Sequence, residues 1–322
     1  MSKKKILYYS QPWWKKQWDK IIYLILLIGF FLFYPGQNIY TVGSDIGKPW
    51  LRRLPFALPT PAPYPVNVTG FNPGAQVGAG GVVVLDVDSG VYLYQRNEKV
   101  QFLPASTTKI LTALVALDAY QLEDIVTVKQ PVNSGQSINL VPGERLTVEN
   151  LLYGTLIASG NDAAYTLAEN YPGGVEKFVE AMNRKAQEIH LVDSSFANPV
   201  GYDAPGQKMS PLDLARLASV ALSNKIIAKI VAIPQITISD VTHTYFHPLS
   251  NVNQLLGKIP GVGGIKTGWT EEAGENLVTL VERNGHRVII VVLKSRDRFG
   301  DTAKLIDWVF ANHRWEIISP TK

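Results

Sequence analysis

The sequence predicts an α/β domain of the α+β type, in which an antiparallel sheet flanked by helices is joined to a mainly helical subdomain. Two hairpin signals lie far apart in the 322-residue chain. Asp88-Ser89-Gly90 joins one pair of strand-like runs, and Asn284-Gly285, the preferred two-residue hairpin turn, joins the other. Residues 147–231 show mostly helical spacing. The sheet's edge strands are therefore expected to come from distant parts of the chain. The strand-like runs are residues 82–87, 91–94, 277–281 and 287–293.

The amino-acid composition of the chain excludes several classes of function. The chain is 46% hydrophobic and 18% charged, as expected for one globular domain with additional segments. Its net charge is +4, but six lysines against one aspartate give the first 20 residues +5, so the remainder carries about −1. A near-neutral body argues against nucleic-acid binding. The absence of cysteine excludes disulfides, thiolate nucleophiles and cysteine metal sites.

A basic and then apolar segment opens the chain. Residues 21–44 contain no charged side chain, and about 20 residues suffice to cross a bilayer, so they are expected to form an N-terminal transmembrane helix. A cleaved signal peptide is the alternative, but the nearest cleavage site, Thr41-Val42-Gly43, is poor. The preceding lysines predict that residues 1–20 are a cytoplasmic tail. The expected location is the cell membrane, with one span and an extracytoplasmic domain.

A proline-rich stalk is expected over residues 45–78. Prolines recur from Pro59 to Pro65, and such runs stiffen a linker into an extended polyproline conformation of about 3 Å per residue. Folded structure is expected over residues 79–322, beginning with the first hairpin and ending with an amphipathic helix at residues 302–311.

Ser106 and Lys109 are the first candidate pair. They lie at the start of a predicted helix over residues 105–120, and residues at i and i+3 share one helical face. A serine hydroxyl becomes a nucleophile when a base takes its proton. A lysine can be that base if burial or nearby positive charge lowers its pKa. The alternative is that Ser106 caps the helix and that Lys109 is solvated.

Ser159 and Asn161 form a second candidate pair, at the junction of two predicted helices. A hydroxyl and an amide in that position can relay a proton and hydrogen-bond an incoming backbone. Helix capping by Asn161 or Asp162 is the alternative.

A third candidate segment, Gly263 to Thr270, places Lys266 and Thr267 between glycines. Glycines allow another backbone to approach closely, as when a bound peptide adds to the edge of a sheet. Lys266 is then a candidate to hold a terminal carboxylate, with Thr267 hydrogen-bonding to it. A glycine-rich turn with an exposed lysine is the alternative.

Together these segments resemble the D-alanyl-D-alanine carboxypeptidases, the low-molecular-mass penicillin-binding proteins. That family and the class A β-lactamases share the set S-x-x-K, S-D-N and K-T-G. The resemblance covers about residues 81–312 and implies a β-lactamase/DD-peptidase-like fold. It rests on Pro104–Thr112, Leu140–Glu144, Ala158–Ala164, Asn198–Gly206, Ser210–Ala215, and Gly264–Gly268 followed by Ala273-Gly274.

The resemblance implies a role for each matching residue. Ser106 is expected to be the acylated nucleophile, Lys109 its base and Ser159 a proton shuttle. The expected substrate-binding residues are Asn161, Lys266, Thr267, Gly268 and Trp269. Backbone N–H groups of Ser106 and Trp269 are expected to form the oxyanion hole. Neither a cofactor nor a metal is implied, because the five histidines form no catalytic cluster.

The expected activity is removal of the terminal D-alanine from peptidoglycan stem peptides, with β-lactam antibiotics as covalent inhibitors. An endopeptidase or transpeptidase, a β-lactamase and an inactive peptidoglycan-binding homologue remain alternatives. The middle motif is Ser-Gly-Asn rather than Ser-Asp-Asn. Residues 193–202 lack the glutamate with which a class A β-lactamase hydrolyses its acyl-enzyme, so slow release of penicillin is expected. We also expect no C-terminal β domain of the kind that many relatives carry. Peptide preference and oligomeric state stay open.

Overall fold

A computed structural model describes residues 13–33, 62–132 and 134–317. The chain divides into two compact units, Met1–Pro59 and Thr60–Lys322. In the first unit, the described residues form helix α1 (Trp13–Phe33). Within the described ranges, no helix combines the length and apolar character needed to cross a bilayer. The structure therefore does not support the predicted transmembrane helix, and residues 34–44 of that segment lie outside the described ranges.

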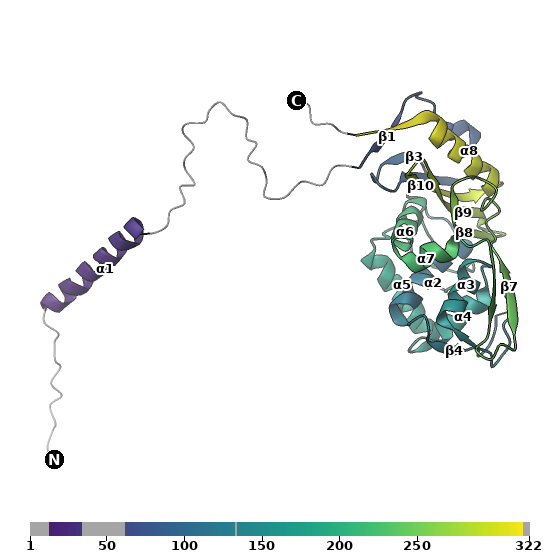
Figure 1. Ribbon diagram of the computed structural model, residues 1–322, viewed down its shortest axis with the longest axis horizontal. Helices are drawn as coiled ribbons and strands as arrows, with labels where there is room; N and C mark the ends of the chain where they lie inside the picture. The colour runs from purple at the N-terminus through teal and green to yellow at the C-terminus, as the bar shows by residue number, and fades with distance from the viewer. Residues whose placement is uncertain (1–12, 34–61, 133, 318–322) are drawn as a thin grey trace, which may run out of the picture. The chain divides into compact units, whose positions relative to one another are not determined.

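The second unit is built on a five-stranded antiparallel sheet with the strand order β3-β2-β10-β9-β8 (Figure 1). Both predicted hairpins are confirmed: β2 pairs with β3, and β9 pairs with β10 across Asn284-Gly285. The edge strands, β3 and β8, come from distant parts of the chain as predicted, and β2 pairs with β10 in the middle of the sheet. The strands are β2 (Gly81–Asp86), β3 (Tyr92–Arg96), β8 (Val262–Thr270), β9 (Gly274–Arg283) and β10 (His286–Ser295).

Strands β2 and β10 bury both of their faces. Alternate side chains point to opposite faces of a sheet, so Val83 and Ile289 enter one hydrophobic cluster, while Val82 and Ile290 enter the other. The second cluster is closed by helix α8 (Arg298–Asn312), which packs on the opposite face from the helical subdomain. This continuous burial explains why these strands read as unbroken apolar runs rather than alternating ones.

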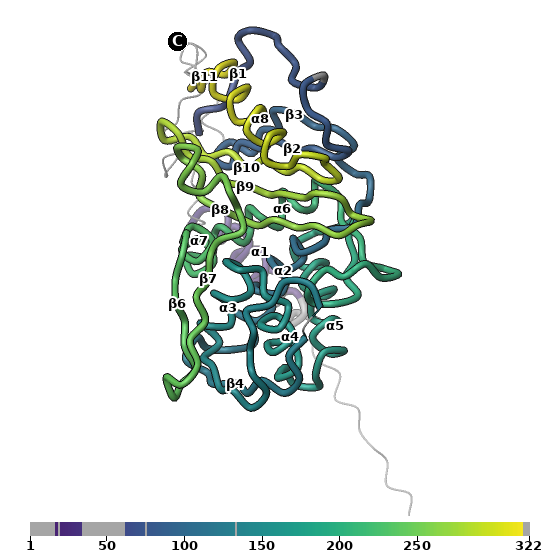
Figure 2. The backbone as a smooth tube through the Cα atoms, turned by 90° about the vertical axis from the view of Figure 1, so that its right-hand side faces the viewer, coloured from purple at the N-terminus to yellow at the C-terminus, as the bar shows by residue number. Residues whose placement is uncertain are grey.

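The helical subdomain covers the other face of the sheet (Figures 1 and 2). Its central helix, α2, is buried along most of its length and contacts the surrounding helices α3 to α6. Two short two-stranded pieces, β4 with β5 and β6 with β7, complete this part of the fold. The helices are α2 (Lys109–Ala119), α3 (Val148–Leu156), α4 (Asn161–Asn170), α5 (Gly174–Glu188), α6 (Pro211–Ser223) and α7 (Lys225–Val231). The short strands are β4 (Ile125–Thr127), β5 (Arg145–Thr147), β6 (Gln235–Ser239) and β7 (Phe246–Ser250).

The compact unit begins earlier than the predicted boundary at residue 79. Strand β1 (Tyr64–Asn67) pairs with the last strand, β11 (His313–Glu316). The 3₁₀ helix η1 (Pro73–Gln76) follows, and Trp308 Nε1 donates a hydrogen bond of 2.8 Å to Phe71 O. The proline-rich composition suggested a linker throughout this segment. Strand β1 can nevertheless contain proline, because both strands of a two-stranded sheet are edge strands, and an edge strand tolerates proline.

Candidate active site

Ser106 does not cap a helix, contrary to the alternative considered from the sequence. It lies in the short 3₁₀ helix η2 (Ala105–Thr108), and neither η2 nor α2 has a side-chain cap. The preceding residue, Ala105, has a φ of +48°, a left-handed conformation that costs an alanine about 1 kcal/mol or more. This strained turn leaves the Ser106 hydroxyl facing the pocket rather than a backbone amide.

Lys109 is the base candidate, and its amine is fully buried. Its Nζ lies 2.8 Å from Ser106 Oγ and donates a 3.0 Å hydrogen bond to Val200 O. Burial holds the pKa of Lys109 well below its usual value of 10.5, and the neighbouring charge of Lys266 lowers the pKa further. The lysine is therefore prepared to accept a proton at a pH well below 10.5, which is the property that the sequence pattern required.

Gly201 allows the loop after Val200 to lie directly against the strained turn. A Cβ at Gly201 would lie 1.8 Å from Ala105 O and 2.8 Å from Thr108 Oγ1. The φ of Gly201 is +88°, so a side chain would be both strained and obstructed. Close packing by this loop positions the carbonyl of Val200 against Lys109.

We expect Gly201→Ala to destabilise the fold by about 3 kcal/mol or more, because the backbone of η2 must move. The shift should also lower catalytic turnover, since Ser106 follows the displaced Ala105 carbonyl. Thermal unfolding measures the first effect. Gly206→Ala is the matched control: its φ of +85° is similar, but nothing lies within 4 Å of the added Cβ. Equal losses in both variants would contradict the role given to packing.

Ser159 and Lys266 form a second hydroxyl–amine pair. Lys266 Nζ donates hydrogen bonds to Ser159 Oγ at 2.7 Å and to Thr267 O at 3.1 Å. Burial lowers the pKa of Lys266 to about 7, with a further contribution from the charge of Arg298. The alternative considered from the sequence, an exposed lysine in a glycine-rich turn, is ruled out because Lys266 is only 2% exposed.

Asn161 faces the pocket and does not cap helix α4, whose cap position is Gly160. Its Nδ2 donates hydrogen bonds to Ser134 O at 2.7 Å and to Tyr202 Oη at 3.1 Å. These bonds hold the amide nitrogen and leave the amide oxygen to face a ligand. The buried Asp162 carboxylate holds the adjacent loop by accepting hydrogen bonds from the backbone N–H groups of Ile138 and Leu140.

Strand β8 carries the Lys-Thr-Gly segment and is an edge of the sheet. Gly268 brings this strand against η2: a Cβ there would lie 3.0 Å from the backbone N of Ser106. The next residue, Trp269, has a largely exposed indole at the rim. The glycine therefore places the backbone of the edge strand beside that of the serine.

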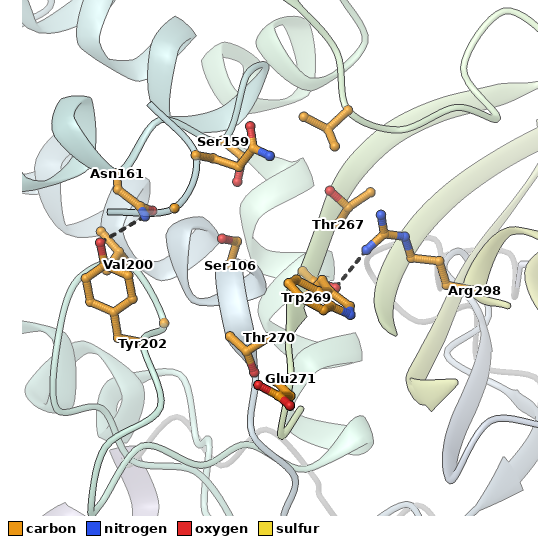
Figure 3. A pocket seen from close by; sticks show the side chains of 15 residues that line it. Ser106, Ser159, Asn161, Val200, Tyr202, Thr267, Trp269, Thr270, Glu271 and Arg298 are labelled. Carbon is orange, nitrogen blue, oxygen red and sulfur yellow. Dashed lines mark hydrogen bonds between the residues drawn. The ribbon is translucent and has the colours of Figure 1, made fainter. Parts of the chain in front are cut away.

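These residues enclose one pocket of about 410 Å³ (Figure 3). The structure brings together in its lining six of the eight residues predicted as site residues; Lys109 and Lys266 are bonded to the two lining serines instead. The predicted residues in the lining are Ser106, Ser159, Asn161, Thr267, Gly268 and Trp269.

Arg298 is the main site residue that sequence reasoning missed. Its side chain lines the pocket, and its Nη1 donates a 2.9 Å hydrogen bond to Gly268 O (Figure 3). Its Nε is buried and has no hydrogen-bond partner among the described residues. In the sequence it stands two residues after Arg296 in a polar turn, with nothing local to distinguish the two. Tyr202 and Glu271 also line the pocket and were not predicted as site residues.

Comparison with known proteins is consistent with this geometry. A family model described as D-alanyl-D-alanine carboxypeptidase matches residues 67–297. The solved structure of the Streptomyces K15 DD-transpeptidase is similar, with a TM-score of 0.69 and 31% identity, over 73% of this chain and 98% of that one. The mixed fold, with its antiparallel sheet and helices, is therefore that of the DD-peptidases.

Curated relatives carry the same family name. The chain is 34% identical over 239 residues to the D-alanyl-D-alanine carboxypeptidase DacB2 of Mycobacterium tuberculosis, covering 71% of this chain and 81% of that protein. It is 35% identical over 241 residues to DacF of Bacillus subtilis and 35% identical over 251 residues to DacD of Escherichia coli, covering 72% of this chain in both cases. The chain spans 62% and 63% of the lengths of those two proteins.

Proposed function

The chain belongs to the D-alanyl-D-alanine carboxypeptidase family, and we propose from this membership that it removes the terminal D-alanine from peptidoglycan stem peptides. The observation that carries the proposal is the 2.8 Å separation between Ser106 Oγ and the fully buried Lys109 Nζ. A buried amine with a depressed pKa beside a pocket-lining serine hydroxyl is the arrangement required for an activated serine nucleophile.

Acylation would begin when Lys109 Nζ takes the proton from Ser106 Oγ. The alkoxide attacks the carbonyl carbon of the penultimate D-alanine and forms a tetrahedral oxyanion. Collapse of that intermediate breaks the C–N bond, and the departing D-alanine amine takes a proton delivered through Ser159, which shares its hydroxyl with Lys266. Water then cleaves the Ser106 ester, releasing the shortened peptide and restoring the hydroxyl.

The backbones of η2 and β8 supply the oxyanion site in this proposal. The N–H groups of Ser106 and Trp269 would donate hydrogen bonds to the developing oxyanion, and such donors typically contribute about 10²–10³ in kcat. The substrate backbone would lie along the edge of β8, where Thr267 and Gly268 line the pocket. Asn161 Oδ1 would accept a hydrogen bond from the peptide N–H.

Arg298 takes the carboxylate-binding role that the sequence assigned to Lys266. The Lys266 amine is already bonded to Ser159 and Thr267, whereas the Arg298 guanidinium lines the pocket and makes a single hydrogen bond among the described residues, from Nη1 to Gly268 O. Thr267 remains the expected hydroxyl donor to the same carboxylate. Burial lowers the pKa of Arg298. An arginine starts from so high a pKa that its guanidinium nevertheless stays charged at neutral pH.

We expect Arg298→Gln to lower kcat/KM for a peptide ending in D-alanyl-D-alanine by about 10- to 100-fold, since a hydrogen bond to a charged group contributes about 1.5–3 kcal/mol. The comparison substrate is the same peptide with a C-terminal amide, on which the variant should lose much less. A similar loss on both substrates would show that Arg298 acts on the fold rather than on the carboxylate.

D-alanine release is the direct test of the proposed function. The compact unit, residues 60–322, should release one D-alanine from each molecule of a diacetyl-lysyl-D-alanyl-D-alanine peptide. A folded protein that releases none, yet binds peptidoglycan fragments, would support the inactive binding homologue instead. Rapid release of hydrolysed, ring-opened penicillin would support a β-lactamase.

Transfer to an amine is a second candidate outcome of the same acyl-enzyme. The similar Streptomyces protein is named a DD-transpeptidase, and a relative from Pseudomonas aeruginosa, 30% identical over 242 residues, is named a D-alanyl-D-alanine endopeptidase. Water and an amine compete for the same ester, so the motif residues serve all three reactions. Adding glycine as acceptor to the D-alanine assay and measuring the peptide product distinguishes transfer from hydrolysis.

The N-terminal segment is proposed to hold the enzyme at the cell membrane, with the catalytic domain outside and the basic tail inside. The proposal rests on the uncharged run of residues 21–44 and on the exposed apolar side chains of α1 from Ile21 to Phe33. Cell fractionation tests it: recovery of the full chain in the membrane pellet after a high-salt wash is expected, and recovery in the wash would contradict it.

A further inference from the structure

The pocket lining contains two charged side chains among the described residues, and they have opposite signs. Arg298 supplies the cation and Glu271 the anion. The two lie at different parts of the pocket, with Arg298 beside Thr267 and Glu271 beside Thr270 (Figure 3). The proposed function uses the cation for the terminal carboxylate of the substrate and leaves the anion without a role.

Glu271 is available to a ligand. The residue is exposed, and its carboxylate makes no hydrogen bond or ion pair with any residue that the structure describes. The other nearby carboxylate, Asp203, is also exposed and accepts a 3.0 Å hydrogen bond from Thr270 Oγ1. The nearest lysines of the site, Lys109 and Lys266, have buried amines bonded to the catalytic serines. The outer part of the pocket is therefore negative.

Trp269 lies two residues before Glu271 and offers an apolar surface in the same pocket. Its side chain is 62% exposed, which is unusual for a large aromatic residue and leaves the face of the indole open to a ligand. An indole face beside a carboxylate suits an aliphatic ammonium group. The methylene stem packs on the ring, the ammonium gains a cation–π contribution, and the carboxylate pairs with the charge.

The spacing along β8 identifies the substrate residue that reaches this surface. Arg298 holds the carbonyl of Gly268, which is three residues before Glu271. Strand β8 ends at Thr270, so only Gly268 to Thr270 advance by about 3.3 Å per residue, and Glu271 is the first residue of the turn that follows. A peptide lying along the edge with its terminal carboxylate at Arg298 reaches this end of the strand with its third residue. The residue before the D-alanyl-D-alanine pair therefore lies beside Glu271.

We infer that Glu271, together with the indole of Trp269, selects substrates in which the residue preceding D-alanyl-D-alanine carries a free aliphatic ammonium group. This inference rests on the proposed function and assigns the substrate class of the same site. Glu271 is a specificity-determining residue in this scheme and takes no part in the chemistry at Ser106.

Paired peptides test the inference. The probes are N-acetyl-lysyl-D-alanyl-D-alanine with a free ε-amine and the same peptide with the ε-amine acetylated or succinylated. The unmodified protein should prefer the free amine by about fivefold in kcat/KM, the size expected of a partly exposed ion pair. Glu271→Gln should bring the ratio of the two rates close to one. Glu271→Lys should reverse the preference toward the succinylated peptide, a gain that misfolding cannot produce.

Glu272→Gln is the matched control, because Glu272 is an exposed neighbour that does not line the pocket. It should keep the ratio of the unmodified protein, and raising the salt concentration should reduce that ratio. Equal rates on all peptides, or the same change from both glutamine variants, would overturn the inference while leaving the carboxypeptidase proposal intact. No D-alanine from any peptide would contradict the proposed function, and the inference would be overturned with it.

Discussion

Ser106→Ala will lower D-alanine release by about 10⁴-fold or more and abolish covalent labelling by penicillin. Removing a serine nucleophile leaves only binding and oxyanion stabilisation, which accounts for the size of the loss. The hydroxyl lines the pocket and has its candidate base, Lys109 Nζ, at 2.8 Å. Intact mass after incubation with penicillin shows whether the adduct forms, and the D-alanine assay measures turnover.

Ser159→Ala provides the comparison for this experiment, since its hydroxyl also lines the pocket and also bonds a buried lysine. It should slow turnover but still form the adduct. Adduct formation by Ser106→Ala would show that another residue is acylated. A wild-type adduct that disappears within minutes would instead support efficient β-lactam hydrolysis, against the slow release expected from the missing glutamate.

Lys109→Arg will reduce the rate of acylation by about 10²–10⁴-fold, the usual contribution of a general base. The guanidinium keeps the positive charge, but it cannot give up a proton in the accessible pH range. The expected loss therefore isolates the proton-accepting role from simple electrostatics. Stopped-flow acylation by a chromogenic β-lactam measures the rate without depending on the later hydrolysis step.

The pH profile gives a second readout of the same residue. The pKa of Lys109 is lowered well below 10.5 by burial and then by Lys266, so the neutral amine forms as the pH rises through that lowered pKa. Acylation by the wild-type protein should rise with pH and level off well below pH 10.5. The arginine variant should lack this rise, and a profile unchanged by the substitution would contradict the assignment of Lys109 as the base.

Lys109→Met controls for folding. A lysine whose folded pKa is below its unfolded pKa binds fewer protons in the native state, so stability rises with pH between the two values. Below the folded pKa the full cost of burying the charge is present. Replacing Lys109 with methionine removes that cost while keeping a similar shape, so the variant should be inactive yet unfold at an equal or higher temperature. A large drop in Tm would show that the amine supports the fold.

Much of the fold followed from local patterns. The Asn284-Gly285 hairpin and the apolar runs of β2 and β10 are encoded by neighbouring residues, and the structure has both. The helical spacing after residue 147 corresponds to helices α3 to α6. These features need only turn chemistry and periodicity, which a single sequence contains. The place of β1 in the domain could not be predicted, because its partner β11 is distant in sequence: Tyr64 pairs with Glu316, about 250 residues later.

The site was predictable where chemistry and spacing coincide within one segment. Ser106 with Lys109 and Ser159 with Asn161 were found because each pair lies within one turn. Whether Ser106 capped a helix could be decided only from the backbone of η2. Arg298 and Glu271 escaped prediction because their role depends on facing a pocket formed by distant segments. Charged residues are common near the ends of helices and strands. Arg298 and Glu271 differ from the others in that their side chains line the pocket.

Because β1 pairs with β11, the polypeptide chain enters and leaves the compact unit at a single two-stranded ribbon. Chain that precedes Tyr64 and chain that follows Glu316 are attached at adjoining points of the surface, beside α8 and on the opposite face of the sheet from the helical subdomain (Figure 1). Joining those two points with a short linker and opening a loop elsewhere should give a circularly permuted enzyme.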